Sequence, residues 1–345
     1  MSTRLRLGTA LLAVLLGAGC ATVSDPLAPV GAKSTPSSAS ETASRSSSPL
    51  ETATGSPSPS PSSEPATPTP TPSPTSEPDG PTLPRGGSEL FPTYRLVGYA
   101  GLTGASTLGR LGTGPLDQRV RELERQATAY AAGREILPVL EVITTIVQGS
   151  PGRDGKYRTR LSDQQIEVYL KAARKRKALL LLNLQPGRSE FLIEAKAYER
   201  WLTEPDVGVA LDPEWAMDPG QRPGASYGHT TGAELNQTAA YLAGLVERHD
   251  LPEKVMVYHQ VATRVVRAES GLKPYPGVVM IKSVDGLGHP GPKKNTYRVV
   301  NRTTPQHVHA GFKLFFTEDV ENGGRLMTPR EVLALQPRPE YVMYE

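Results

Sequence analysis

The stretch VGVALDPEW, residues 207–215, sets the pattern by which the folded part of the chain is interpreted. Its first five residues are apolar or small and too few for a stable helix, which is typical of a buried parallel strand. Two carboxylic residues, Asp212 and Glu214, follow at once with Pro213 between them. Proline has no backbone amide donor, so it suits the end of a strand. The stretch therefore predicts a buried β-strand that ends in two acidic side chains.

Seven further short apolar runs alternate with amphipathic segments on either side of this strand. The expected strands are residues 95–100, 137–143, 178–184, 207–211, 254–259, 277–284, 310–316 and 341–344. Eight strands alternating with helices favour an α/β fold, a (β/α)8 TIM-type barrel of about 250 residues. An open, doubly wound sheet is the alternative, because the pattern does not show closure. Ser162, Thr231 and Thr328, each followed three residues later by Gln or Glu, mark helix starts.

The first 85 of the 345 residues differ in composition from the rest. They hold 15 of the 33 prolines and no aromatic residue, and the first aromatic is Phe91. Such a segment cannot bury enough apolar surface to offset its chain entropy, so we expect a disordered Pro/Ser/Thr-rich linker over residues 21–85. Residues 86–345 form the expected barrel domain. They carry 33 basic and 29 acidic side chains, a balance that argues against a nucleic-acid partner.

Residues 1–20 have the composition of an export signal. Arg4 and Arg6 precede an apolar run over residues 7–16, and three small residues lead to Cys20, the single cysteine. This end resembles the lipobox of bacterial lipoproteins. The resemblance implies that Cys20 carries the lipid, palmitate included, and anchors the protein on the outer, extracytoplasmic side of the cell membrane. Simple secretion with an unmodified Cys20 is the alternative.

Polar side chains stand at the carboxyl ends of most of the expected strands. They are Glu141, Asn183, Gln185, Asp212, Glu214, His259, Asp285 and Lys313. In β/α barrels this edge carries the catalytic site, so we expect these side chains to meet. Residues two apart on a strand face the same way, so Asp212 and Glu214 would both point into the barrel mouth. Two carboxylic acids in one poorly hydrated site cannot both ionise cheaply, and one should keep its proton near neutral pH.

An acid, a carboxylate partner and an aromatic platform are what cleavage of a glycosidic bond needs. Trp215 supplies flat aromatic surface directly after the acidic pair. The candidate catalytic residues are Glu214, Asp212, Asp285 and Glu141. The candidate substrate-binding residues are Gln185, Asn183, Trp215, His259, Lys313, Arg188 and Tyr99.

The strand end Leu211-Asp212-Pro213-Glu214 resembles the fourth strand of barrel glycoside hydrolases, including the family 25 lysozymes and, more loosely, chitinase-type barrels. The resemblance implies that Glu214 is the general acid and Asp212 its acidic neighbour. The folded part also resembles uncharacterised lipoproteins of actinobacteria, through Gln185-Pro186-Gly187-Arg188 and residues 212–215, 258–260 and 311–313. We expect a monomeric, lipid-anchored glycoside hydrolase that acts on a cell-wall polysaccharide without a cofactor.

Two other functions use the same residues. A divalent cation, instead of a proton, would relieve the surplus negative charge, with Glu141, Asp212, His259 and Asp285 as ligands of a metal-dependent hydrolase or isomerase. A non-catalytic glycan-binding barrel would keep Trp215 and tolerate the loss of Glu214.

Overall fold

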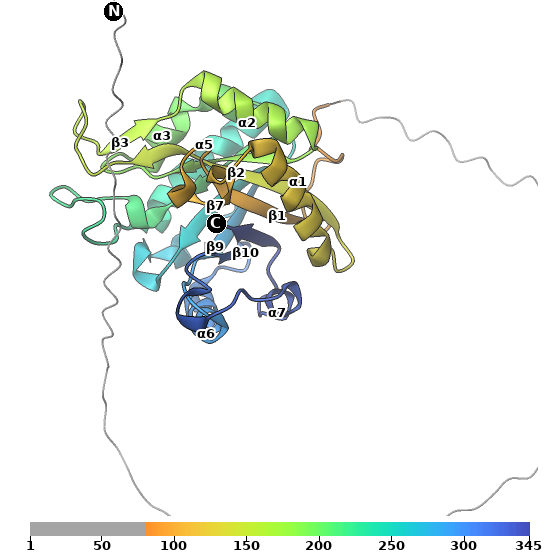
Figure 1. Ribbon diagram of the computed structural model, residues 1–345. Coiled ribbons are helices and arrows are strands. Elements are labelled where there is room, and N and C mark those ends of the chain that lie inside the picture. The colour runs from red at the N-terminus through yellow and green to blue at the C-terminus, as the bar shows by residue number, and fades with distance from the viewer. Residues whose placement is uncertain (1–79) are drawn as a thin grey trace, which may run out of the picture. The chain divides into compact units, whose positions relative to one another are not determined.

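The computed structural model describes residues 80–345, and its centre is a closed ring of eight parallel strands (Figure 1). The strands are β1 Tyr94–Gly101, β2 Glu135–Val147, β4 Leu179–Leu184, β5 Val207–Leu211, β7 Lys254–Gln260, β9 Val278–Val284, β10 His309–Leu314 and β11 Tyr341–Tyr344. Each pairs in parallel with the next, and β1 pairs with both β2 and β11. The ring is therefore closed, which confirms the predicted barrel and excludes the open, doubly wound sheet.

Helices surround the outside of the ring (Figure 1). They are α1 Leu116–Ala127, α2 Asp163–Lys175, α3 Phe191–Ala197, α4 Glu199–Leu202, α5 Gly232–His249, α6 Pro290–Val300 and α7 Pro329–Leu333. The capping boxes predicted at Ser162, Thr231 and Thr328 are confirmed. Each hydroxyl accepts a hydrogen bond from the backbone amide three residues later. Between residues 80 and 345, no helix combines the length and the apolar character needed to cross a membrane.

Two clusters of buried apolar side chains hold the barrel together. One fills the inside of the ring and includes Leu137, Ala210 and Val257. The other lies between the strands and the helices and includes Leu211 and Leu242. Successive residues of a strand point to opposite faces, so seven of the eight barrel strands contribute to both clusters. In β10 only Phe312 and Leu314 contribute, both to the outer cluster.

The apolar packing begins a few residues earlier than the sequence predicted. Leu83 is buried with Leu90 in the inner cluster, although we assigned Leu83 to the linker. The folded domain therefore starts before residue 86. Burial of a leucine side chain contributes about 1.5–3 kcal/mol to stability. The export signal predicted for residues 1–20, with Cys20, and the part of the predicted linker that precedes residue 80 lie outside the described residues.

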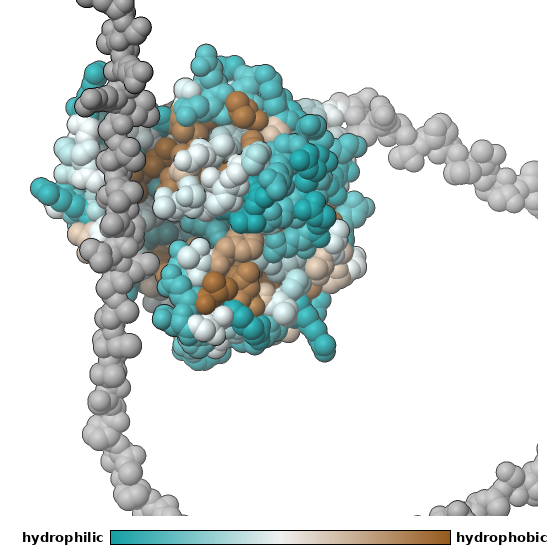
Figure 2. All heavy atoms as spheres, viewed as in Figure 1, coloured by the Kyte–Doolittle hydropathy of each residue, from teal (hydrophilic) through white to brown (hydrophobic). Residues whose placement is uncertain are grey.

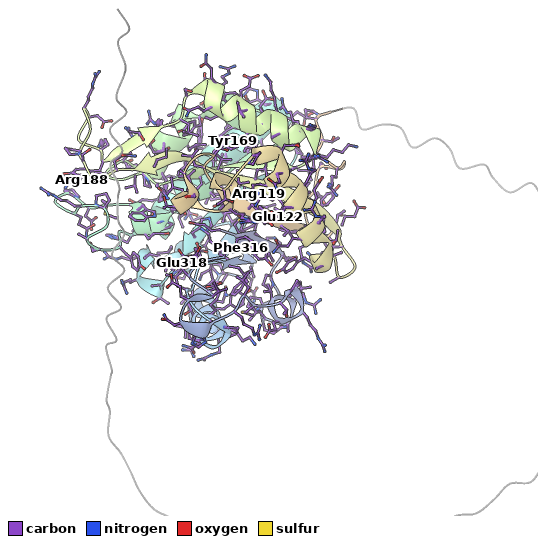
Figure 3. All side chains as sticks on the ribbon, viewed as in Figure 1. Arg119, Glu122, Tyr169, Arg188, Phe316 and Glu318 are labelled. Atoms are coloured by element: carbon purple, nitrogen blue, oxygen red, sulfur yellow. The ribbon has the colours of Figure 1, made fainter. Side chains whose placement is uncertain are left out.

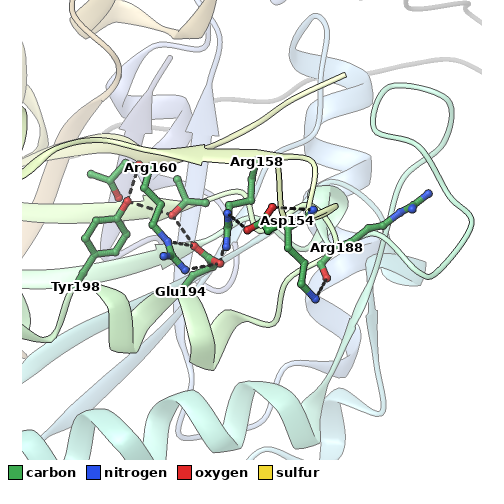
Figure 4. Close-up of polar contacts among 9 residues, drawn as sticks. Asp154, Arg158, Arg160, Arg188, Glu194 and Tyr198 are labelled. Carbon is green, nitrogen blue, oxygen red and sulfur yellow. Dashed lines mark hydrogen bonds and ion pairs between the residues drawn. The ribbon is translucent and has the colours of Figure 1, made fainter. Parts of the chain in front are cut away.

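A β-hairpin extends from the ring over α3 (Figure 4). The end of β2 pairs antiparallel with β3, Arg158–Arg160. The carboxylate of Glu194 on α3 is buried and accepts hydrogen bonds from Arg158 Nε at 2.9 Å and Arg160 Nε at 2.7 Å. Each arginine is thus paired with a desolvated carboxylate, which fixes the hairpin on the helix.

This hairpin in turn holds the loop that follows β4. The amide of Arg188 donates to the carbonyl of Lys156 at 2.7 Å. Gly187 has a φ of +59°, and a Cβ there would lie 2.2 Å from the same carbonyl oxygen. Only glycine fits this backbone and this close approach. The loop that carries Gln185 toward the barrel mouth is therefore locked in place.

Candidate active site

The candidate site is the layer of inward-facing side chains directly above the apolar filling of the barrel. Ala210 and Val257 belong to the inner cluster. Asp212 lies two residues after Ala210, and His259 lies two residues after Val257. The same alternation brings further polar residues into this layer, namely Glu141, Asn183, Ser283 and Lys313, with Gln185 and Asp285 one step further along. Strand ends that are far apart in the sequence thus meet in one place, at the carboxyl edge of the ring.

His259 lies in the middle of this layer, fully buried, with carboxylates around it. Its Nδ1 lies 2.8 Å from Asp285 Oδ2. Its Nε2 lies 3.0 Å from Glu141 Oε1 and 3.9 Å from Asp212 Oδ1, and it makes no hydrogen bond with either in the described residues. Burial lowers the pKa of His259, but the charges of Asp285 and Glu141 outweigh it and raise this pKa well above its usual value. The imidazole is therefore a cation at neutral pH.

Glu141 is fully buried and ionised. Its Oε1 accepts a hydrogen bond from Asn183 Nδ2 at 2.9 Å, and its Oε2 accepts a hydrogen bond from the Tyr341 hydroxyl. Burial raises the pKa of Glu141, but the charge and proximity of His259 outweigh it and lower the pKa to about 2. Glu141 is therefore a fixed anion rather than a proton donor.

Asp285 is a second fixed anion. Its Oδ1 accepts a hydrogen bond from Ser283 Oγ at 2.8 Å, and its Oδ2 faces both His259 and Lys313 Nζ, the latter at 3.3 Å. Burial opposes ionisation, but the two cations lower the pKa of Asp285 below its usual value. Lys313 itself stays charged, because Asp285 and Glu345 outweigh its burial and raise its pKa.

Asp212 has weaker partners than these two anions. Its Oδ1 and Oδ2 accept hydrogen bonds from neutral amides, Asn183 Nδ2 at 3.3 Å and Gln185 Nε2 at 3.2 Å. Burial raises the pKa of Asp212 to about 6, although His259 and Lys313 pull it down. At neutral pH this carboxyl group is therefore mainly ionised, and it takes up a proton near pH 6.

Glu214 stands at the border between the buried layer and the surface. We expected strand alternation to point it inward, but β5 ends at Leu211 and Pro213–Trp215 form a 3₁₀ turn. The amide of Trp215 donates to the Asp212 carbonyl at 3.0 Å, and the amide of Gly228 donates to the Glu214 carbonyl at 2.7 Å. The turn and its neighbouring loop, rather than the strand, therefore place this side chain.

The carboxyl group of Glu214 is well suited to keep a proton. The residue is partly exposed, yet its Oε2 is buried and has no hydrogen-bond partner among residues 80–345. Burial, followed by the charges of Asp212 and Asp285, raises the pKa of Glu214 to about 8. At neutral pH a protonated acid thus stands two residues from an ionised carboxylate whose charge acts on it, which suits a general acid with its partner.

Of the predicted substrate-binding residues, Tyr99 does not join this layer. Ala100 pairs with Glu141 and takes the inward position on β1, so Tyr99 points outward. Its hydroxyl donates to Gln126 and Glu122 on α1. The expectation for Tyr99 is wrong because it lies one residue out of phase with the inward face.

Arg188 and Trp215 lie at the edge of the site. The guanidinium of Arg188 donates to the Gln221 carbonyl at 2.6 and 3.0 Å and stacks 4.4 Å from the ring centre of Tyr157. Figure 3 shows Arg188 at the outer edge of the barrel's mouth face, whereas Phe316 and Glu318 lie nearer its middle. Trp215 is partly exposed beside Glu214. Both are rim residues, and neither belongs to the buried layer.

Three residues of the site did not emerge from the sequence. Tyr341 hydrogen-bonds Glu141, Ser283 hydrogen-bonds Asp285, and Glu345 lies 2.5 Å from Lys313 through its Oε2. Glu345 follows the eighth strand directly, as Asp212 follows the fourth. The rule that polar residues end the strands would have found it.

A cavity of about 260 Å³ lies between the first turns of α3 and α5, and its lining includes the rim residue Arg188 but no residue of the buried layer. Phe191 and Met217 give it apolar surface, and Ser189, His229 and Gln237 add polar groups. Ala216 and Met217 of its lining follow Trp215 directly. The space-filling view of the mouth face shows hydrophobic patches toward its middle and mainly hydrophilic surface at its edge (Figure 2).

Within the described part of the chain, no three His, Asp or Glu side chains are arranged to hold one metal ion together. The side chains expected as ligands have other partners. Glu141 is bound by Asn183 and Tyr341, and Asp285 is bound by Ser283 and His259.

Neither a protein-family model nor a curated protein matches the chain. Among solved structures, the chain is similar to a GH18 chitinase from Pseudoalteromonas aurantia, with 13% sequence identity and a TM-score of 0.31 over 72% of this chain and 93% of that chain. A likeness at this level does not bear on activity. The class of protein is thus defined by its own features, a closed β/α barrel with a buried cluster of carboxylates and cations at its carboxyl edge.

Proposed function

We propose that the protein is a glycoside hydrolase that acts on a cell-wall polysaccharide, with Glu214 as the general acid. Glu214 would give its proton to the glycosidic oxygen as the bond from the anomeric carbon to that oxygen breaks. A water molecule would then supply the hydroxyl group that the anomeric carbon gains, and its remaining proton would replace the one that Glu214 gave. Asp212 is the carboxylate partner that stabilises the positive charge formed on the sugar. The observation that carries the proposal is the contrast between two carboxyl groups at the end of β5. Asp212 accepts hydrogen bonds from two amides, whereas Glu214 has a buried Oε2 with no partner in the described residues.

The other buried groups serve this pair. Glu141 and Asp285 are too firmly ionised to donate protons, and His259 and Lys313 balance them. We therefore propose that the charges of these four residues set the electrostatic field around Glu214. Gln185 holds Asp212 through its amide, and Trp215 is the aromatic platform for the sugar at the rim.

The experiment is incubation of the protein with fractionated cell-wall polysaccharides, followed by detection of new reducing ends. The parent is expected to release them, and Glu214→Gln is expected to lose about 100-fold or more of the rate while remaining folded. Glu247→Gln, at an exposed glutamate near the end of α5, is the matched control. Glycan binding without release of reducing ends by the parent would replace this proposal with the non-catalytic binding barrel.

We also propose that lipid at Cys20 anchors the protein on the extracytoplasmic side of the cell membrane, with the segment up to residue 79 as tether. The support is the sequence alone, in which the single cysteine follows a stretch with the composition of an export signal. Cys20→Ala is expected to move the protein from the membrane fraction to the medium. Retention of the variant in the membrane fraction would refute the anchor.

A further inference from the structure

Glu345 is fixed over the mouth of the barrel, beside the candidate site. Its amide donates to the Leu314 carbonyl at 2.9 Å, and its carbonyl accepts from the Phe316 amide at 2.9 Å. Its Cγ lies against Gly109, where an added Cβ would come within 2.9 Å of it. The backbone and the packing therefore leave this side chain little freedom to turn away.

The amine of Lys313 lies between the carboxylates of Glu345 and Asp285. Its Nζ is 2.5 Å from Glu345 Oε2 and 3.3 Å from Asp285 Oδ2. The side chain of Lys313 is 6% exposed, whereas that of Glu345 is 26% exposed. The closer partner is thus the one that also meets solvent. Glu345 draws toward the mouth a positive charge that would otherwise lie against the buried anion.

Lys313 is also the first link in a series of alternating charges that runs inward. The contacts pass from Glu345 to Lys313 at 2.5 Å, to Asp285 at 3.3 Å, to His259 at 2.8 Å and to Glu141 at 3.0 Å. Interactions of this kind are strong where water is excluded, so a change at one end alters the charges further along. Asp212 and Glu214 adjoin this series and would respond to the change.

We propose that Glu345 is a positioning residue, which holds Lys313 at the barrel mouth and so limits the positive charge that Asp212 and Asp285 receive. The proposal rests on the acid/base pair proposed above. From the surrounding elements, Lys313 on β10, Glu318 after β10 and Asp212 after β5 act on Glu345 by their charges. Arg110, in the loop after β1, is paired with Glu122 at 2.6 Å.

The test is the variant Glu345→Gln, which keeps the shape of the side chain and removes its charge. Asp212 would then receive more of the charge of Lys313, so its carboxyl group should titrate at a pH lower by about half a unit to one unit. The readout is the chemical shift of the carboxyl carbon of Asp212, followed by NMR from about pH 3 to pH 9. The control is Glu318→Gln, which removes a neighbouring acid that is not among the ion-pair partners of Lys313 in the described residues and should leave this midpoint within about 0.3 units.

An unchanged midpoint for Asp212 in folded Glu345→Gln protein would overturn the proposal. Should that variant not fold, Glu345→Asp keeps the charge at a greater distance and should give a smaller shift in the same direction, and no shift would overturn the proposal equally. The titration uses no substrate. A shifted midpoint in a protein that cleaves no glycan would therefore support the role of Glu345 and refute the glycosidase, whereas cleavage with an unshifted midpoint would do the reverse.

Discussion

His259 Nδ1 lies 2.8 Å from Asp285 Oδ2, and both side chains are buried at the carboxyl edge of the barrel. An imidazolium and a carboxylate each pay a large desolvation cost in such a place and stay charged only because they face each other. The pair supplies fixed charges of both signs at the centre of the site. The charges of this pair act on the pKa values of Asp212 and Glu214.

Loss of the imidazole should destabilise the protein in a pH-dependent way. His259→Asn leaves Asp285 and Glu141 without their shared cation, which is expected to lower the free energy of unfolding by about 3–5 kcal/mol. The pKa of His259 is raised in the folded state. Its stabilisation is therefore complete below the unfolded value, about pH 6.5, and is lost as the pH rises through the folded value.

Urea unfolding of His259→Asn at a series of pH values measures this effect. The deficit relative to the parent should be largest at or below about pH 6.5 and shrink toward alkaline pH. His249→Asn, at an exposed position at the end of α5, is the matched control and should stay within about 0.5 kcal/mol of the parent. A deficit that does not vary with pH would contradict the assignment of a charged imidazole.

Activity should follow a bell-shaped pH profile. The rate requires Asp212 ionised and Glu214 protonated, so kcat/KM should rise through about pH 6 and fall through about pH 8. Asp212→Asn should remove the acidic limb, and Glu214→Gln should remove the alkaline limb from the residual rate. A profile that keeps its alkaline limb in Glu214→Gln would assign the acid to another residue.

The loop after β4 should tolerate no side chain at Gly187. Gly187→Ala places a Cβ 2.2 Å from the Lys156 carbonyl at a φ of +59° and should cost about 1–3 kcal/mol or more in stability. It should also lower kcat, because Gln185 on this loop holds Asp212. Gly155→Ala is the matched control, with a φ of +73° and no atom within 4 Å of the added Cβ. Equal losses for the two variants would refute the steric argument.

Removal of divalent cations distinguishes the proposed acid/base mechanism from a metal-dependent hydrolase or isomerase. Because protons relieve the surplus charge in this account, prolonged treatment with EDTA should leave the release of reducing ends within about twofold of the untreated rate. Loss of the rate, with recovery on addition of Mg²⁺, Mn²⁺ or Zn²⁺, would instead assign Glu141, Asp212, His259 and Asp285 as metal ligands.

The sequence predicted the barrel because parallel strands covered on both faces leave a simple mark, a short continuous apolar run. The strands at Val207–Leu211 and Tyr341–Tyr344 agree with the prediction to the residue. The polar residues that end these runs were equally visible, since few positions in an apolar run carry charge. That is why Glu141, His259 and Asp285 could be named before their contacts were known.

Other features depend on phase and packing, which composition does not reveal. Tyr99 and Ala100 are both apolar enough for either face, and only the pairing of Ala100 with Glu141 shows which one faces inward. Tyr341 reads as a core residue until its hydroxyl is seen to contact Glu141. Glu214 reached the site by a 3₁₀ turn and not by the strand alternation that predicted it. The loop that follows also holds this turn, since the amide of Gly228 donates to the Glu214 carbonyl.

The proton on Glu214 is the claim on which the account depends most directly. It can be measured as the titration midpoint of the Glu214 carboxyl carbon by NMR, with Glu214→Gln to assign the signal. Burial and the neighbouring anions Asp212 and Asp285 place the expected midpoint at about pH 8. A midpoint near the ordinary glutamate value, about pH 4.3, would show an ionised side chain at neutral pH and would contradict its role as the acid.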